Sequence, residues 1–578
     1  MELLTDIKQR LTKRINLTLG TELAQPSDFV SPPNPELGDL SWPCFEAAKT
    51  LKKSPAAVAS DLAAAISAHH DGEKNSGHGQ NCPLQTITAV GPYLNFTLNN
   101  TFLAKNILPQ IQKEKKNFGT NKSGAKQKVM IEYSNANTHK EYHVGHLRNI
   151  SYGDAVNHIL SANGFQVIPV SYINDFGIHV AKTIWFMDKY NQKPDSDNKG
   201  FFLGQMYVAA TSKMAEVGDE AKTEVGAIMK GIESRKGKYY QVWNKTRKWS
   251  IQQFDQIYKE LNVKFKHTFY ENEFVAEGLK IVTALTKKGF LKKSEGAIIA
   301  DLEPYNLNVL LFLRSDGTAL YPVADVPLAM MKFKKYKLNK SIYVVDIRQS
   351  LYFKQLAKVL ELLGYDKEIV HLGYDFVKLP NGMMSSRTGN VITYEDLKEQ
   401  MLIKTTAETK KRHTDWSAKK VADVAWKIAM GAIKFEMVKV GPQSIIIFDI
   451  NEALRFDGFT AAYLQYTYAS ANSILKKAPK TKSAVDFSTL TETKERILLL
   501  KLANYSKAVA KAGVNYDPSE ITKYLFELAQ LFNDYYHNIP VLKAEPKVMA
   551  TRLTLIRSVN TVLANGLELL GIEVIQEM

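Results

Sequence analysis

The stretch KVMIEYSNANTHKEYHVGHLRNISYGDAVNHIL, residues 128–160, decides the fold of this chain. Its apolar start, 129–131, leads in as a strand, and a polar turn then ends at His143-Val144-Gly145-His146, where a helix is predicted to begin. Apolar residues continue at helical spacing until Gly164 ends the helix, and a second strand is predicted over 166–172. The sequence therefore predicts a strand-helix-strand unit of a parallel sheet, whose ligands lie beyond the carboxyl ends of the strands.

The start of the predicted helix is suited to an anion. Main-chain N–H groups without partners and the positive end of the helix dipole attract negative charge at such a position. His143 and His146 add two imidazoles, and Gly145 leaves room for a ligand close to the main chain. A turn with two surface histidines explains these four residues equally well, so the motif needs a second signal.

The second signal is GMMSSRTGN, residues 382–390. Small hydroxyl residues, an arginine and two glycines are typical of a mobile loop that folds over a triphosphate, with Ser385, Ser386 and Arg387 as donors. Alone, this stretch could be a solvated surface loop. Nucleotidyl transfer needs donors on both sides of the reacting phosphorus, so the two stretches together predict adenylate chemistry.

These two stretches resemble the signatures of the class I aminoacyl-tRNA synthetases, and further blocks resemble the arginyl-tRNA synthetases in particular. The resemblance covers essentially the whole chain, in the family's order. It implies an arginine–tRNA ligase that forms arginyl-adenylate from L-arginine and ATP, releases pyrophosphate, and transfers the arginyl group to the 3′-terminal ribose of tRNA(Arg). The arginine-specific blocks are EYSNAN (132–137), RSDGT (314–318), YPVAD (321–325), VDIRQ (345–349) and YLQY (463–466).

The resemblance also implies roles in the first chemical step. His143 and His146 would donate to the phosphates of ATP, with Gly145 and Met384 against the nucleotide, while Ser385, Ser386 and Arg387 would close on the leaving group. The family's second signature usually carries lysines, but this chain has Met383 and Ser386 at those positions. Lys140, just before the histidines, would supply the missing charge; as an alternative, it is a solvent-facing lysine.

Selection of arginine must reject lysine, which carries the same charge on a compact ammonium. A guanidinium has five donors in a rigid plane, so a carboxylate and amide oxygens around that plane discriminate by geometry. Without the family, Tyr321 and Asp325 would read equally well as a pair on an ordinary helix. The predicted pocket consists of Asp325, Tyr321 one helical turn earlier, and Gln349, with Glu132, Ser134 and Asn137 at the amino-acid end or in the pocket wall.

A chain of 578 residues with 45% hydrophobic content is expected to form three or four domains. The resemblance implies an α/β, Rossmann-like parallel-sheet catalytic domain with a helical insertion, an α+β N-terminal domain and an all-α C-terminal anticodon-binding bundle. Four further strands are predicted to resume the parallel sheet, at 297–302, 309–314, 342–346 and 369–377. The predicted domains are 1–112, 113–380 with the insertion at about 191–277, 381–456 with the signature loop and a stem contact, and 457–578.

The formal net charge of +16 favours a polyanionic partner, although a basic protein without a nucleic-acid role has the same composition. Basic residues alternate with Trp243 and Trp249 in the insertion and could hold the single-stranded acceptor end of a tRNA, unless these rings are core. Ala461-Ala462 and Ser470 depart from the family's Gly-Pro and arginine, which puts the usual arginine contact in doubt. The resemblance implies tRNA contacts at Tyr93 and Asn95 for the elbow, and at Tyr463, Tyr466 and Met578 for the anticodon.

Two cysteines, Cys44 and Cys82, cannot form a disulfide framework or a four-cysteine zinc site. The expectations are a monomeric cytoplasmic protein without signal peptide or membrane span, and no protein-bound metal beyond Mg²⁺ carried by ATP. Three alternatives remain at this point. They are an RNA-binding relative without catalysis, a metal hydrolase built on His139, His143 and His146, and a synthetase for cysteine or glutamate.

Overall fold

A parallel sheet forms the centre of the molecule, with the strand order β11-β10-β4-β5-β6. The computed structural model describes residues 3–73, 82–194, 197–378, 380, 392–479 and 483–578. The predicted strand-helix-strand unit is confirmed, because β4 and β5 pair in parallel and α5 connects them. The bounds are β4 Lys128–Glu132, α5 Val144–Ala162, β5 Gln166–Ile173, β6 His267–Tyr270, β10 Lys340–Asp346, α12 Ser350–Leu362 and β11 Glu368–Tyr374.

Two predicted strands do not belong to this sheet. Residues 297–302 and 309–314 form β8 (Ala297–Asp301) and β9 (Val309–Leu313), which pair antiparallel with each other, while β8 also pairs with β7 (Lys292–Ser294). The prediction was wrong because short apolar runs occur in both kinds of sheet and periodicity does not separate them. The fifth parallel strand is instead β6, which lies inside the range predicted as a helical insertion.

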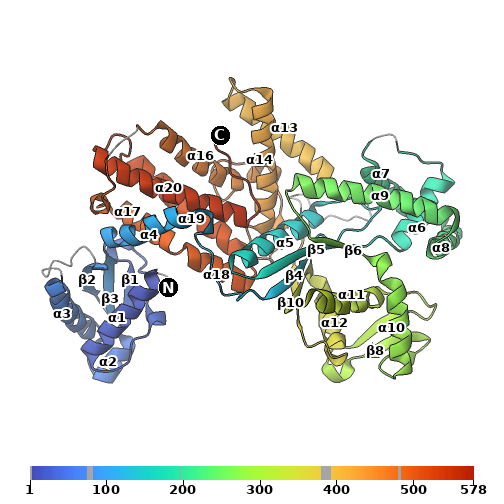
Figure 1. The fold of residues 1–578 in the computed structure, drawn as a ribbon, viewed down its shortest axis with the longest axis horizontal. Helices are drawn as coiled ribbons and strands as arrows, with labels where there is room; N and C mark the ends of the chain where they lie inside the picture. Colours follow the sequence, from blue (N-terminus) through green and yellow to red (C-terminus); the bar gives the residue numbers. More distant parts are fainter. Residues whose placement is uncertain (1–2, 74–81, 195–196, 379, 381–391, 480–482) are drawn as a thin grey trace.

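Two units extend from the sheet at the same end of the molecule (Figure 1). One is helical and has its own core around Trp185 and Trp243, so the prediction that Trp243 could be a core residue is confirmed. The other combines the antiparallel strands with helices that pack on them. The helices are α6 Ile178–Lys189, α7 Lys199–Val217, α8 Asp219–Glu233 and α9 Gly237–Glu260 in the first unit, and α10 Val275–Lys287 and α11 Tyr321–Tyr336 in the second.

The N-terminal domain lies at the opposite end (Figure 1) and contains an antiparallel sheet of order β1-β3-β2. It contacts the C-terminal helices through an ion pair between Asp39 and Arg496 (3.1 Å) and a hydrogen bond from Asn100 Nδ2 to Leu490 O (2.9 Å). The elements are α1 Leu3–Leu19, β1 Leu40–Pro43, α2 Phe45–Leu51, α3 Pro55–Glu73, β2 Leu84–Val90, β3 Tyr93–Leu98 and α4 Asn100–Glu114.

Helices dominate the C-terminal part, as predicted, and they share one large core with α1 and α4. None of the helices in the described ranges is both long and apolar enough to cross a membrane. The bounds are β12 Val377–Lys378, α13 Tyr394–Arg412, α14 Ala418–Val438, β13 Ile446–Ile447, α15 Ile450–Ala453, α16 Ala461–Lys477, α17 Thr493–Ala503, α18 Tyr505–Asn515, α19 Ser519–Asn538 and α20 Pro546–Leu569.

Helix α5 joins the sheet to these C-terminal helices. Its buried Arg148 donates to the carbonyl of Pro442 (3.0 Å), and Tyr152 Oη donates to the carbonyl of Tyr516 (3.0 Å). Asp154 is buried beside Lys434 of α14, whose ammonium also donates to the carbonyl of Gly571 (2.8 Å). Helix α5 is therefore bonded to several segments of the C-terminal part, and its first turn carries the histidine motif.

Candidate active site

His143 and His146 form a reciprocal cap at the start of α5. Nδ1 of His143 accepts the main-chain N–H of Gly145 (3.1 Å), and Nδ1 of His146 accepts the main-chain N–H of His143 (3.2 Å). A neutral imidazole carries its proton on the other nitrogen when Nδ1 accepts. Each ring therefore has an Nε2–H group that is not used by the cap and is available to donate.

Both rings are neutral at physiological pH. Burial, assisted by the charge of Lys140, lowers the pKa of His143 to about 4, and burial with the neighbouring His143 and Lys140 lowers the pKa of His146 well below its usual value. The two ring centroids are 4.0 Å apart. A Cβ atom at Gly145 would come within 2.9 Å of the His143 ring, so the glycine permits this close arrangement.

Lys140 lies near the two histidines, as predicted, because its charge acts on both of them. Its ammonium is 5.2 Å from the ring centroid of Tyr207 on α7, and the ammonium of Lys182 is 5.0 Å from the same ring. Cation–π contacts of this kind hold a lysine at a defined place. The start of α5 thus combines neutral donors with positive charge, which suits an anionic ligand.

The predicted second signature cannot be placed, since Met384, Ser385, Ser386 and Arg387 lie outside the described residues. The chain that follows it is placed, and it runs along the histidine motif. The N–H of Val144 donates to the carbonyl of Ile392 (3.3 Å), and the N–H of Tyr394 donates to the carbonyl of Tyr142 (2.7 Å). Ile392 and Tyr394, which follow the second signature in the sequence, are therefore bonded to the histidine motif.

A cluster of carboxylates gathers at the carboxyl edge of the sheet. Glu132 ends β4, Glu271 directly follows β6, and Asp325 lies in the second turn of α11. Burial raises the pKa of Asp325 to about 7, although the hydroxyl of Tyr352, which donates to Oδ2 of Asp325, opposes the rise. The carboxylate of Asp325 is therefore poorly hydrated, so that its ionised form favours a cationic partner. This agrees with the prediction of Asp325 as a pocket residue.

Glu271 was not predicted from the sequence. Burial, together with the charges of Asp325 and Asp175, raises the pKa of Glu271 to about 8. Asp175 already has cationic and amide partners in Arg247 and Asn272. Glu271 is thus a second carboxyl group beside Asp325. A cation next to it would favour its ionised form. The order of the strands in the sheet places Glu271 beside Asp325. The sequence ENE (271–273) itself gives no indication of a ligand-binding residue.

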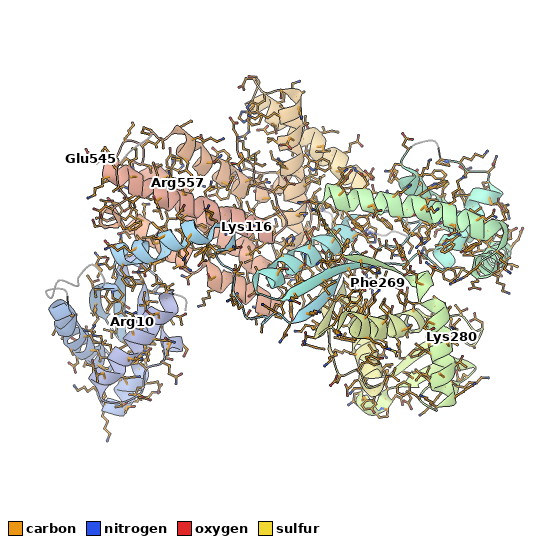
Figure 2. All side chains as sticks on the ribbon, viewed as in Figure 1. Arg10, Lys116, Phe269, Lys280, Glu545 and Arg557 are labelled. Atoms are coloured by element: carbon orange, nitrogen blue, oxygen red, sulfur yellow. The ribbon has the colours of Figure 1, made fainter. Side chains whose placement is uncertain are left out.

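Glu132 forms a buried ion pair with Lys332 of α11, and the two side chains are 5% and 0% exposed. Lys332 follows Asp325 by seven residues, which is two helical turns, so both lie on one face of α11. The ammonium of Lys332 also lies 5.1 Å from the ring centroid of Phe269, which Figure 2 shows on β6. The pair therefore fastens α11 to β4 and β6.

The other predicted pocket residues differ in their exposure and contacts. Tyr321 is 61% exposed at the start of α11, and Gln349 is exposed after β10. Asn137, which follows β4, forms an isolated parallel β-bridge with Asn174, which follows β5. The hydroxyl of Ser134 is fully buried and bonded to the hydroxyls of Tyr142 (2.9 Å) and Tyr258 (3.0 Å), so it holds neighbouring rings in place.

The residues predicted to contact a tRNA lie in the N-terminal domain and in the C-terminal helical part. Tyr93 is exposed beside Phe45, whereas Asn95 in the middle of β3 is only 3% exposed. Tyr466 is exposed on α16. The hydroxyl of Tyr463, also on α16, accepts from Asn533 (2.8 Å). The side chain of Met578 packs on a small apolar cluster with Trp416 and Ile575.

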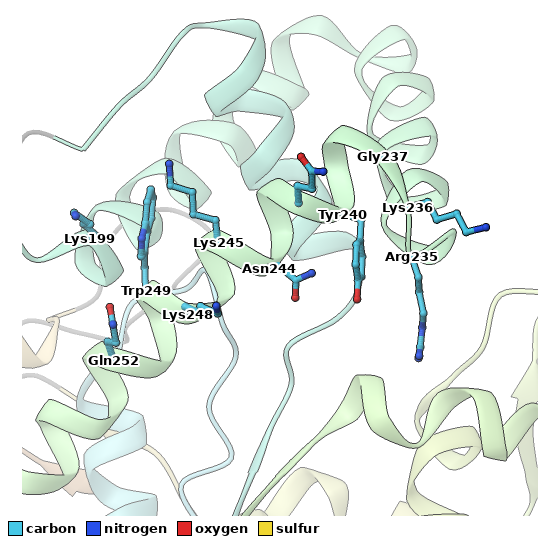
Figure 3. Close-up of a pocket in the computed structure, with 11 residues that line it drawn as sticks. Lys199, Arg235, Lys236, Gly237, Tyr240, Asn244, Lys245, Lys248, Trp249 and Gln252 are labelled. Atoms are coloured by element: carbon cyan, nitrogen blue, oxygen red, sulfur yellow. The ribbon is translucent and has the colours of Figure 1, made fainter.

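A basic pocket of about 800 Å³ lies along α9 in the helical unit. Figure 3 shows its side chains, which come mainly from α9 and the turn before it. The ammonium groups of Lys199 and Lys245 lie 5.8 and 5.5 Å from the ring centroid of Trp249. Among the described residues, no acidic side chain lines this pocket. Its lining residues are Lys199, Arg235, Lys236, Gly237, Tyr240, Gln241, Asn244, Lys245, Lys248, Trp249 and Gln252.

His139 does not join the other two histidines as a metal ligand. It is fully buried, and its Nε2 and Nδ1 atoms are bonded to the hydroxyls of Thr246 (2.7 Å) and Thr138 (3.0 Å). Within the described ranges, no group of three histidine, cysteine, aspartate or glutamate residues is arranged to hold a metal ion. The hydrolase alternative therefore loses its third ligand.

Three family models match this chain in succession. They are described as "Arginyl tRNA synthetase N terminal domain" for residues 1–98, "tRNA synthetases class I (R), catalytic domain" for residues 107–449, and "DALR anticodon binding domain" for residues 464–578. Together these models span nearly the full chain, and the class I model alone covers more than half of it.

Individual relatives agree. The chain is 37% identical over 562 residues to the arginine–tRNA ligase of Bdellovibrio bacteriovorus, covering 95% of this chain and 94% of the relative. It is 34% identical to the ligase of Treponema denticola, covering 96% and 95%. Among solved structures, the arginyl-tRNA synthetase of Thermus thermophilus superimposes with a TM-score of 0.76 at 27% identity, covering 99% of this chain and 100% of that one.

Proposed function

The chain belongs to the arginyl-tRNA synthetases of class I, and from this premise we propose how its residues carry out the reaction. It is an arginine–tRNA ligase, which joins L-arginine to tRNA(Arg) with ATP as the second substrate. The reaction passes through arginyl-adenylate, with release of pyrophosphate, before the arginyl group reaches the 3′-terminal ribose. Which residues serve each step is the proposal that follows.

In the first step the carboxylate of arginine attacks the α-phosphorus of ATP and pyrophosphate leaves. No protein nucleophile is required, so acceleration comes from positioning and from donors that bind more strongly as charge builds on the phosphates. We assign this task to the Nε2–H groups of His143 and His146 and to the ammonium of Lys140. Mg²⁺ is proposed to enter as part of the substrate, bound to the triphosphate, and Met384, Ser385, Ser386 and Arg387 to close on it.

Neutral donors suit this step better than imidazolium ions would. A group that stays neutral binds the ground-state triphosphate only moderately and keeps its donor aimed at the reacting phosphate. The reciprocal cap supports this assignment, because both Nδ1 atoms are occupied by main-chain N–H groups and both Nε2–H groups are left for a ligand. The positive end of the α5 helix dipole lies at the same place and also favours a negatively charged ligand.

The side chain of arginine is proposed to lie between Asp325 and Glu271. Two carboxylates offer acceptors on two sides of a guanidinium plane, and burial strengthens each charge-assisted hydrogen bond. Tyr321, Gln349, Asn137 and Glu132 are proposed to line the remaining wall and to hold the amino-acid end. Buried acceptors left unsatisfied by a wrong side chain can supply about ten-thousand-fold discrimination, so no editing site is needed.

The DALR domain binds the anticodon end of tRNA(Arg). For the opposite end, we propose that the basic pocket along α9 receives the single-stranded acceptor end. Its lysines suit phosphates, and Trp249 and Tyr240 provide rings on which a base can stack. Tyr93, Tyr466, Tyr463 and Met578 remain proposed contacts for the elbow and the anticodon.

One observation carries this proposal: two partly buried carboxyl groups with raised pKa and two outward-donating histidines share one edge of the sheet. The test is a charging assay with purified protein, ATP, Mg²⁺ and total tRNA, run with arginine and with each of the other amino acids. We expect charging with arginine alone, and pyrophosphate exchange with the same preference. Equal charging with lysine, or tRNA binding without any exchange, would refute the assignment.

A further inference from the structure

Tyr352 makes the hydrogen bond that holds the carboxylate of Asp325. It lies in the first turn of α12 and donates its hydroxyl proton to Oδ2 of Asp325 on α11, 27 residues earlier. Burial and the charge of Asp325 raise the pKa of Tyr352 well above its usual value, so the phenol stays protonated and remains a donor. Within the part of the chain that the structure describes, this is the only hydrogen bond or ion pair of the Asp325 side chain.

We propose that Tyr352 is a positioning residue, which fixes the plane of the Asp325 carboxylate and thereby makes the pocket selective for a planar guanidinium over other cations. The proposal rests on the arginine-binding role assigned to Asp325 above. It goes beyond that role, because Tyr352 itself need not touch the substrate.

The carboxylate needs such an anchor. The terminal torsion of an aspartate is broad and roughly two-fold, so the plane of the group is poorly defined by its own rotamer. Among the described residues, the cation that faces it is Lys332, which is already held by Glu132, and the other groups that face it are acids or phenols. Those groups are Glu132 from β4, Glu271 after β6, Tyr172 from β5, Tyr321 from α11 and Tyr343 from β10.

A fixed plane matters more for a guanidinium than for an ammonium. Two parallel N–H bonds form only when the guanidinium and carboxylate planes nearly coincide, whereas an ammonium accepts any direction. A carboxylate has about four acceptor sites, so the bond from Tyr352 leaves enough of them for a two-pronged contact. Selectivity for arginine is therefore expected to depend on the Tyr352 hydroxyl, and charge attraction to depend on it much less.

Tyr352→Phe tests this directly, because the ring stays and only the donor is lost. We expect the KM for arginine to rise about tenfold or more, from the loss of a charge-assisted bond, while kcat changes by less than about twofold. Agmatine and cadaverine, a guanidinium and an ammonium of similar length, serve as competitive probes. The inhibition constant of agmatine should rise in parallel with KM, and that of cadaverine should change little.

Tyr343→Phe is the matched control. Tyr343 lies in the same apolar cluster as Phe353, beside Tyr352, but its hydroxyl is not bonded to Asp325. This variant should keep the KM and both inhibition constants of the unmodified enzyme. Equal losses in both variants, or equal losses for agmatine and cadaverine in Tyr352→Phe, would show general damage to the core and overturn the proposal.

Two further measurements separate the loss of the hydrogen bond from general damage to the core. In an Asp325→Asn background, Tyr352→Phe should add little to KM, because the bond it removes no longer orients a carboxylate. Placing 2,3-difluorotyrosine at position 352 makes a stronger donor and favours the ionised carboxylate. The rise of arginine affinity with pH should then move to lower pH, whereas Tyr352→Phe should move it to higher pH.

Additive effects in the double variant, or a pH profile that does not move in either direction, would contradict the role of Tyr352. These outcomes are separable from failure of the proposed function. If the unmodified enzyme charged no arginine, the function itself would be wrong; if it charged arginine and all position-352 variants behaved alike, only the positioning role would be wrong.

Discussion

The main-chain N–H of His143 donates to Nδ1 of His146 across 3.2 Å, so the His146 ring caps helix α5 with one nitrogen and presents the other outward. The two tasks can be separated by substitution. An asparagine at position 146 keeps an acceptor close to the place of Nδ1 but has no donor at the place of Nε2. Alanine has neither group.

His146→Asn and His146→Ala should both slow arginine-dependent pyrophosphate exchange by about 100- to 1000-fold, the usual loss for one phosphate donor. Only His146→Ala should also lower the free energy of unfolding, by about 1 kcal/mol, because it loses the cap. Urea titration and exchange kinetics measure the two effects, and tRNA binding should persist in both variants. Normal exchange in His146→Asn would remove the histidine from the mechanism.

Arginine binding should release protons. Asp325 and Glu271, with pKa values of about 7 and about 8, are partly protonated in the free enzyme, and a guanidinium favours their ionised forms. Because the cation binds the deprotonated state, affinity should rise as pH increases through this range. Calorimetry in two buffers of different ionisation enthalpy should report about one to two protons released per arginine near pH 6.5 and almost none near pH 9.

Glu271→Gln provides the matched variant for this measurement, since it keeps the size of the side chain and cannot titrate. We expect it to release about one proton fewer near pH 6.5 and to weaken arginine binding about 10- to 100-fold, as for loss of a charged partner. A binding enthalpy independent of the buffer would show that neither carboxyl group titrates on binding, and the pocket would be wrong.

Lys332→Met should be severely destabilising, because it leaves the charge of Glu132 buried without a partner. Such a change typically costs about 3–5 kcal/mol, measured as the free energy of unfolding in urea. The double variant Glu132→Gln/Lys332→Met removes both charges and should recover a large part of that loss. If the double variant were no more stable than Lys332→Met, the pair would not be the feature that fastens α11 to the sheet.

Trp249→Ala should raise the KM for tRNA about tenfold, the scale of one lost base-stacking contact, and leave the KM for arginine unchanged. Lys245→Gln should reduce the salt dependence of tRNA binding by nearly one phosphate contact. Lys238→Gln is the control, because Lys238 lies on the same helix but pairs with Asp188 (2.7 Å) and does not line the pocket. Equal effects at positions 238 and 245 would point to general charge and against a site.

Local sequence patterns predicted the strand-helix-strand unit that carries the histidine motif. Its strand, turn and helix follow from the apolar pattern of residues 128–160 and from Gly164, which was predicted to end the helix. The prediction that Tyr321 lies one helical turn before Asp325 is confirmed, since both residues lie in the first two turns of α11. Features that depend on neighbours in the sequence could therefore be read from the sequence.

Features that depend on strand order could not. Glu271 follows HTFY, a strand of four residues inside a range dominated by helical periodicity, and only the pairing of β5 with β6 carries it towards Asp325. The same limit explains the misplaced β8 and β9. Tyr352 reaches Asp325 only because α12 packs beside α11, and the burial of Asn95 depends on its place in the middle of β3. Domain boundaries remain predictions for a similar reason.

One pocket at the carboxyl edge of the sheet is proposed to hold a guanidinium and a nucleotide together. A crystal structure with L-arginine and a non-hydrolysable ATP analogue would locate both ligands. We expect the guanidinium between Asp325 and Glu271, the carboxylate of arginine facing the α-phosphate, and the phosphates within hydrogen-bond distance of Nε2 of His143 and His146. Arginine bound away from Asp325, or phosphates out of reach of both histidines, would contradict this proposal.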